Sequence, residues 1–184
     1  MKEDYLMKKL FCLLLALGLL MGALSAFAGE GAITQKLIEQ TAAFLDEQGI
    51  KYSFDSQYNT YEFDFALDSK LSKVNVAIWL YDDMVYVDAD SPLRVEPEYR
   101  DAVAKFITLL NRDTFYCYFL LDYESGLLTC RSAQLIRDQL PGKGEMEDLL
   151  YSPLEFMEGY GDALLKISTQ GANPDQVYQD LKQK

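Results

Sequence analysis

The sequence predicts an α+β fold built on one antiparallel sheet, and two patterns indicate it. Apolar and polar residues alternate over residues 61–67 and 74–80, a period of two that is typical of strands with one buried face. Apolar residues recur at helical spacing over residues 33–48 and 98–110. Because the strand patterns are grouped and joined by short polar links, we expect antiparallel pairing, with helices packed against the sheet.

Turn and cap residues divide the chain into these elements. Gly49 ends the first helix, Gly126 supplies a positive φ in a short hairpin loop, and Gly171 ends the last long helix. Pro153 is well placed to open that helix, because proline is tolerated in a first helical turn. The expected order is helix 33–48, strands 50–54, 61–67, 74–80 and 84–89, helix 98–110, strands 115–121 and 127–131, an irregular stretch 140–152, helix 153–169, and a short helix after Asn173-Pro174.

Composition excludes several classes of function. The 184 residues carry 29 acidic and 17 basic side chains, a net charge of −12, which argues against nucleic acid as a partner. The chain has no histidine, so Ser-His and Cys-His catalysis and His-ligated zinc are excluded. No glycine-rich phosphate loop is present, and we expect no cofactor.

The N-terminus resembles a secretory signal peptide. Lys8 and Lys9 precede an apolar run over residues 10–24, which is about 15 residues long and shorter than the roughly 20 that span a membrane. Cleavage is expected between Ala28 and Gly29. We therefore expect a signal peptide over 1–28, with Met7 a more natural start than Met1, and a single domain over 29–184. That domain is secreted, periplasmic or in the cell envelope, without membrane contact after cleavage; a retained membrane anchor is the alternative.

Two cysteines fall in the predicted hairpin. If Asp122 pairs with Leu127, Cys117 lies opposite Ser132, and the two sulfurs share a face at diagonal positions. A loop one residue shorter or longer would point them to opposite faces, so neither register places them directly opposite one another. Export permits a disulfide, but two small buried hydrophobic thiols are the interpretation that we favour.

The carboxylates give no catalytic or metal site. Asp82, Asp83, Asp88 and Asp90 cluster around one predicted strand, but no EF-hand loop is present, so a solvated acidic sheet face is expected. A small exported hydrolase with two carboxylates is the alternative function, although so many acidic residues make close pairs inevitable. We predict no catalytic and no metal-ligating residue.

Trp79 and Tyr81 are the candidate interaction residues. They alternate with Val76, Ile78 and Leu80, so they point outward if that apolar face packs against the helices. Exposed Trp and Tyr anchor protein interfaces. The alternatives are burial in an ordinary core, or closure of a homodimer.

The order of these elements, with several local strings, resembles the YbjN family, whose fold is similar to that of type III secretion chaperones. The similarity covers about residues 33–182. The matching strings are Leu109-Leu110-Asn111-Arg112-Asp113, then Phe119, Asp122, Gly126, Leu127 and Arg131, with Val85-Tyr86-Val87, Ala102-Val103-Ala104 and Gly171-Ala172-Asn173-Pro174.

The resemblance implies a compact interaction module that often dimerises, and it supplies no catalytic residues. Family members without a signal peptide are cytoplasmic, whereas this chain is expected to be exported. This difference puts a strict secretion-chaperone role in doubt. We therefore expect a secreted, non-enzymatic module that binds an unidentified protein partner. A structural or envelope-associated protein without a specific ligand is a third reading.

Overall fold

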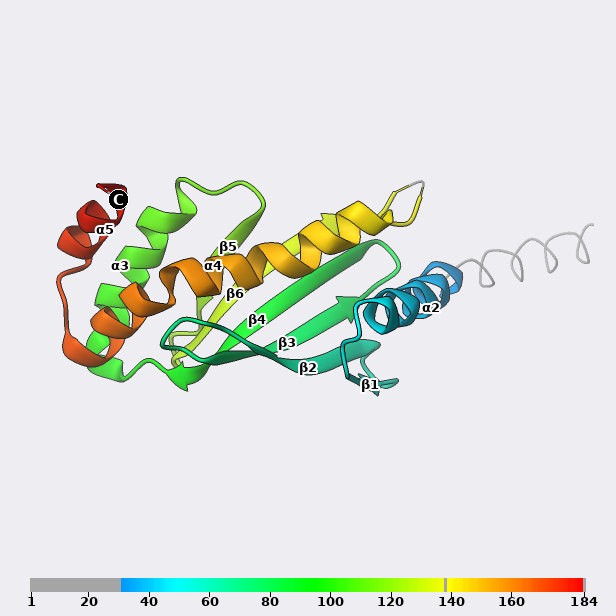
Figure 1. The fold of residues 1–184 in the computed structure, drawn as a ribbon, viewed down its shortest axis with the longest axis horizontal. Coiled ribbons are helices and arrows are strands. Elements are labelled where there is room, and N and C mark those ends of the chain that lie inside the picture. Colours follow the sequence, from blue (N-terminus) through cyan, green and yellow to red (C-terminus); the bar gives the residue numbers. More distant parts are fainter. Residues whose placement is uncertain (1–30, 138, 184) are drawn as a thin grey trace, which may run out of the picture.

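The computed structural model describes residues 31–137 and 139–183, and within them it confirms the α+β class. The predicted signal peptide and its cleavage site at Ala28 and Gly29 lie outside the described residues. In chain order the elements are α2 (Ala32–Glu47), β1 (Ser53–Asp55), β2 (Thr60–Ala66), β3 (Lys73–Leu80), β4 (Met84–Arg94), the 3₁₀ turn η1 (Pro97–Tyr99), α3 (Arg100–Asn111), β5 (Cys117–Leu121), β6 (Leu127–Leu135), α4 (Lys143–Gln170) and α5 (Pro174–Lys182) (Figure 1).

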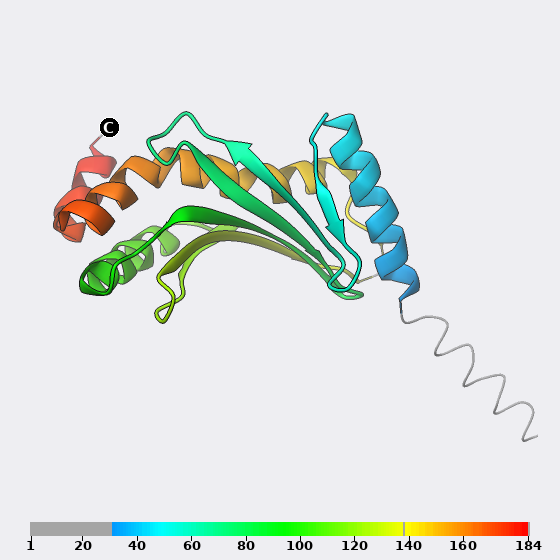
Figure 2. The same cartoon turned by 90° about the horizontal axis from the view of Figure 1, so that it is seen from below.

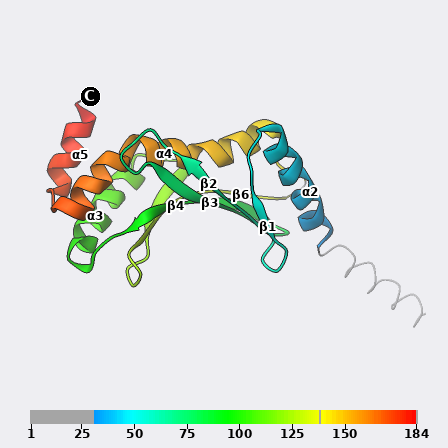
Figure 3. The same cartoon turned by 60° about the horizontal axis from the view of Figure 1, so that its bottom comes forward.

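The strands form one antiparallel sheet in the order β1-β2-β3-β4-β6-β5. The first four strands form a meander, and α3 then carries the chain beyond β4 so that β5 becomes an edge. The sheet is strongly bent (Figure 2). Its helices are α2 at one end, α3 and α5 together at the other, and α4 along one face (Figures 2 and 3).

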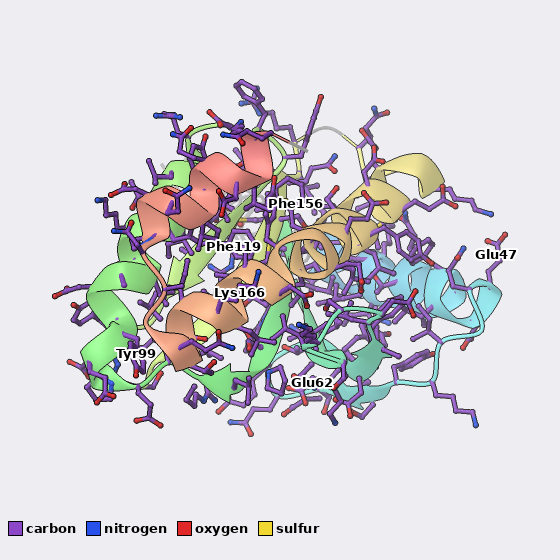
Figure 4. All side chains as sticks on the ribbon, turned by 60° about the vertical axis from the view of Figure 1, so that its left-hand side comes forward. Glu47, Glu62, Tyr99, Phe119, Phe156 and Lys166 are labelled. Atoms are coloured by element: carbon purple, nitrogen blue, oxygen red, sulfur yellow. The ribbon has the colours of Figure 1, made fainter. Side chains whose placement is uncertain are left out.

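Alternation along the strands decides which face is covered. In β3 the side chains of Val74, Val76, Ile78 and Leu80 are at most 1% exposed. They belong to one hydrophobic core with residues of α2, α3 and α4. Phe119 of β5 and Phe156 of α4 pack together in this layer, with ring centroids 6.3 Å apart (Figure 4). The opposite face of the sheet carries no helix of the described chain.

Helix α2 is joined to the sheet through its N-terminus. Asp82, in the β3–β4 turn, accepts hydrogen bonds from the backbone N–H of Gly31 and of Thr34, and from the Thr34 hydroxyl. A helix leaves its first N–H groups without internal partners, so this carboxylate caps it from 48 residues away in sequence. The cap holds the pKa of Asp82 below its ordinary value, with the Thr34 hydroxyl as the main cause.

The prediction that Pro153 opens a helix after an irregular stretch is wrong. Helix α4 begins at Lys143, and Pro153 lies inside it. Proline has no N–H for the carbonyl of Leu149, four residues earlier. The buried hydroxyl of Ser132 in β6 donates to that carbonyl at 2.5 Å instead. The sheet thus supplies the hydrogen bond that the helix lacks, and α4 continues through the proline.

The two hairpin strands differ in extent from the prediction. β5 begins at Cys117 rather than residue 115, and Phe115 and Tyr116 are 93% and 84% exposed. β6 continues to Leu135 rather than ending at residue 131. β6 therefore extends beyond the first residue of β5, the edge strand with which it pairs.

The cysteine register is the predicted one. Cys117 pairs with Ser132, and the N–H of Asp122 donates to Leu127. Both Cys117 and Cys130 are free and buried, at 2% and 0% exposure. The neighbouring Cys117, and after it burial, raise the pKa of the Cys130 thiol, so it stays protonated. The interpretation of two buried hydrophobic thiols is therefore confirmed.

Candidate binding face

We call the face of the sheet without a helix the open face. Side chains directly opposite one another in an antiparallel pair point to the same side, so the pairing register gives its composition. Its central positions are Thr60, Trp79, Tyr86 and Ala133 in one row across the strands, and Glu62, Ala77, Asp88, Arg131 and Tyr118 in the next.

Three aromatic rings form a stack on the open face, and we call them the aromatic patch: Trp79, Tyr81 and Tyr86. The ring of Tyr86 lies 5.9 Å from that of Trp79 and 5.9 Å from that of Tyr81, with interplanar angles of 20° and 19°. Tyr81 is 41% exposed, whereas Trp79 and Tyr86 are partly buried. Burial raises the pKa of the Tyr86 phenol, which stays neutral. The patch is therefore a continuous aromatic surface in which each ring packs against a neighbour.

The indole of Trp79 has an unpartnered donor. Its Nε1 is inaccessible to solvent and makes no hydrogen bond with any described residue. Buried indole N–H groups usually find an acceptor. Because this atom is closed to solvent, a bound group could reach it only if neighbouring side chains moved.

Beside the patch lies an ion pair that the sequence did not predict. Arg131 binds Asp88 through two hydrogen bonds of 2.6 and 2.7 Å, and its guanidinium lies 4.2 Å from the centre of the Tyr86 ring. Asp88 is only 8% exposed. The expectation of a solvated acidic sheet face is therefore wrong for Asp88, because β6 places an arginine directly opposite it. The bidentate pair and the cation–π contact fix the orientation of Tyr86.

The next carboxylate along β4 is in a different environment. Asp90 accepts a hydrogen bond of 2.5 Å from the hydroxyl of Thr129. Burial, as the largest cause, raises the pKa of Asp90 above its ordinary value. Among residues 31–137 and 139–183, no group of three or more Cys, Asp or Glu side chains could hold a metal ion. In the same residues no helix combines the length and apolar character needed to cross a membrane.

Carboxylates also line a cavity of about 670 Å³ between α4, α5 and the β2–β3 loop. Glu158 accepts from the backbone N–H of Asp68, and Asp162 accepts from that of Lys70. These carboxylates hold the loop against α4, where Gly161 lets Ser69 approach closely. Their hydrogen bonds to the loop backbone give Glu158 and Asp162 a structural role.

Sequence alternation placed Trp79 and Tyr81 on one side of β3, and the structure places both on the open face. It did not indicate Tyr86, Asp88 or Arg131 as their neighbours. The alternation in β4 could have placed Tyr86 and Asp88 on the same face as Trp79. Arg131 needed the β4–β6 register, which no local pattern carries, because the two strands are not consecutive in sequence.

Comparison with known proteins rests on structure. No protein-family model and no curated protein matches the sequence. The structure is similar to YbjN from E. coli, a proposed transcription regulator, with a TM-score of 0.54 and 15% identity, covering 72% of this chain and 92% of that one. The chain has a YbjN-like fold.

The same fold occurs in a chaperone complex. The structure is similar to a chain of the ExsC–ExsE complex, with a TM-score of 0.53 and 19% identity, covering 72% of this chain and 96% of that one. The YbjN-like fold thus includes a type III secretion chaperone, as the sequence resemblance implied. At these identities the likeness establishes the fold alone.

Proposed function

We propose that this chain is a secreted, non-enzymatic protein-binding module that holds a segment of a partner protein on the open face. The observation that carries the proposal is the aromatic patch, where stacked rings lie on a sheet face that no described helix covers. Aromatic side chains that lose little freedom on binding are the usual anchors of protein interfaces. The ExsC–ExsE complex, in which the same fold binds a protein, supports this use of the fold.

Charge defines the chemistry of the partner segment. The chain has a net charge of −12, and Glu62 is an exposed carboxylate on the open face. Lys73 and Arg131 are both engaged by carboxylates, Asp64 and Asp88. A segment with apolar side chains for the aromatic patch and basic side chains around them is complementary to this surface. Export through the predicted cleavage after Ala28 would place the module outside the cytoplasm.

Selection of peptides from a random display library against the purified chain tests the proposal. Trp79 is the single tryptophan, so its fluorescence reports directly on the aromatic patch. Selected peptides should shift the emission of Trp79 and lose at least about tenfold in affinity with Tyr81→Ser, equivalent to about 1.4 kcal/mol. Tyr123→Ser, at an exposed tyrosine in the β5–β6 loop, is the matched control and should leave affinity unchanged.

Peptides that bind equally well to Tyr81→Ser and wild type would refute the proposed site, as would a library that yields no binder. Light scattering on the wild type and on Trp79→Ala separates the rival use of the surface. A wild-type dimer that becomes a folded monomer in Trp79→Ala would assign the aromatic patch to a second copy of the chain and overturn the proposal. A wild-type monomer supports it.

A further inference from the structure

The cavity between α4, α5 and the β2–β3 loop is separate from the open face. It lies at the end of the molecule where α5 is found, whereas the β3–β4 turn beside Tyr81 lies at the other end, next to α2 (Figures 1 and 3). Its volume of about 670 Å³ falls within the range of small-molecule sites, about 300–1,000 Å³. Three separate elements form its walls, which is the shape of a small-molecule site rather than of a flat protein interface.

Helix α5 is fastened to α3, and this arrangement leaves the cavity between α5 and α4. Tyr178 of α5 is 5% exposed, and its hydroxyl is hydrogen-bonded to Arg112 and Asp113 at the end of α3. Lys105 of α3 pairs with Asp175 in the first turn of α5. These contacts fix one side of α5 against α3, so that another side faces α4 across the cavity.

Part of the cavity wall is apolar. Val177 and Leu181, one turn apart on α5, line the cavity and are only partly buried. Gly159 of α4 also lines it, and a Cβ at this glycine would meet no atom within 4 Å. Glycine weakens a helix interior, and no described neighbour requires it at this position. Its effect is to leave room in the cavity.

The charge on the cavity wall is negative and spread out. Four carboxylates line it, against the single ammonium of Lys166 (Figure 4); they are those of Asp68, Glu158, Asp162 and Asp180. Glu158 and Asp162 lie one turn apart on α4, whereas Asp180 lies on α5. Each of the two α4 carboxylates binds the loop backbone through one oxygen, and its second oxygen accepts no hydrogen bond from a described residue.

The spacing of these carboxylates decides the kind of cation. A metal ion needs several oxygens that converge on one point, and the described part of the chain has no group of three or more acidic or cysteine side chains that could hold one. Carboxylates on two helices, with apolar side chains between them, instead match a ligand whose positive charges are separated by alkyl stems.

We propose that this cavity binds a linear aliphatic polyamine. Its alkyl stems lie against Val177 and Leu181, and its ammonium groups pair with the carboxylates of α4 and α5. The long side chain of lysine behaves in the same way in proteins, with its stem on apolar surface and its head on polar groups. The site shares no residue with the aromatic patch and does not depend on the proposed function.

Isothermal titration calorimetry with spermidine tests the proposal. Spermidine should bind the wild type with one-to-one stoichiometry, and at least about tenfold more tightly than Mg²⁺ or a blocked tetralysine peptide. Mg²⁺ needs converging oxygens, and the peptide brings a main chain that needs more room than a polyamine does. Equal affinities for the three cations would show attraction to net charge alone and overturn the proposal, as would the lack of saturable spermidine binding.

A variant that fills the cavity without changing its charge locates the site. Gly159→Leu should weaken spermidine binding at least about tenfold, yet raise the thermal midpoint, because leucine favours a helix more than glycine does. Gly144→Leu is the matched control, at another glycine of α4 with open space around it, and should leave binding unchanged. Wild-type affinity in Gly159→Leu would place spermidine outside the cavity and overturn the proposal.

Charge reversal on α5 tests the ammonium contacts. Asp180→Lys should weaken spermidine binding at least about tenfold. Asp180 is exposed and accepts a hydrogen bond from Gln176 of the same helix, so the variant is expected to fold. Asp83→Lys, an equal change of charge at an exposed residue of the β3–β4 turn, should have little effect. Equal weakening by both variants would overturn the proposal.

The result is distinguishable from failure of the proposed function. Tyr81→Ser should bind spermidine as the wild type does, because Tyr81 lies on the open face, away from the cavity. A chain that binds spermidine but selects no peptide would keep the polyamine site and reject the peptide-binding face. Loss of spermidine binding in Tyr81→Ser would place the polyamine on the open face and overturn the proposal.

Discussion

The hydroxyl of Ser132 should contribute to stability only because residue 153 is proline. In the wild type this hydroxyl is the donor to the buried carbonyl of Leu149. Ser132→Ala leaves that carbonyl without a partner, and an unsatisfied buried acceptor costs about 1–3 kcal/mol. In a Pro153→Ala background the new backbone N–H can donate to Leu149, as in any helix. Ser132→Ala should then cost less than about 0.5 kcal/mol, a coupling of at least about 1 kcal/mol.

Urea unfolding of the wild type, both single variants and the double variant measures this coupling. Ser91→Ala is the matched control: Ser91 is 5% exposed, but its hydroxyl accepts from the N–H of Leu93 rather than donating to α4. Its cost should be the same in both backgrounds. If Ser132→Ala costs the same with alanine at 153 as with proline, Ser132 does not replace the missing helical bond and the reasoning fails.

Three other results are expected. Because burial raises the pKa of Asp90 above 3.8, the folded state binds this proton more readily than the unfolded state. Lowering the pH from about 7 to about 4 should therefore stabilise the wild type relative to Asp90→Asn, as urea unfolding at each pH would show; parallel profiles would contradict this. Gly126→Ala should destabilise the protein by at least about 1–3 kcal/mol in thermal or urea unfolding, because its φ is +73° and a Cβ would lie 2.3 Å from the carbonyl oxygen of Val95. An unchanged midpoint would show that this loop can move freely. Cys117 and Cys130 should react with a thiol reagent only after unfolding in denaturant. Rapid labelling of the native protein, or no labelling after unfolding, would contradict two buried free thiols.

Local patterns predicted the parts of this fold that depend on local physics. Alternation gave β2 and β3, and helical spacing gave α2 and α3, because one buried face imposes these periods. The start of α4 was missed because Gly142, Gly144 and Pro153 all argue locally against a helix. Glu145, which accepts from the N–H of Gly142, and the distant Ser132 overcome those preferences. A hydrogen bond from another element leaves no trace in the local sequence.

The residues of the candidate site also fall into two groups: those that local sequence patterns predicted and those that required the structure. Trp79 and Tyr81 could be selected from their alternation with buried residues. The ion pair of Asp88 and Arg131 joins strands that are neighbours in space but are separated in sequence by α3 and β5. The sequence thus identified two aromatic residues of the open face, and the structure identified the residues that surround them.

The ion pair on the open face separates shape recognition from charge recognition. Arg131 and Asp88 already neutralise one another, and Asp88 has lost most of its water before any partner arrives. A partner covering them meets no isolated charge to dehydrate, and a charged group of its own has no free counterpart there. At the centre of the open face, partners must then be distinguished by how well their side chains fit around the rings of the aromatic patch. Selection by charge is left to Glu62, the exposed carboxylate in the same row of the open face.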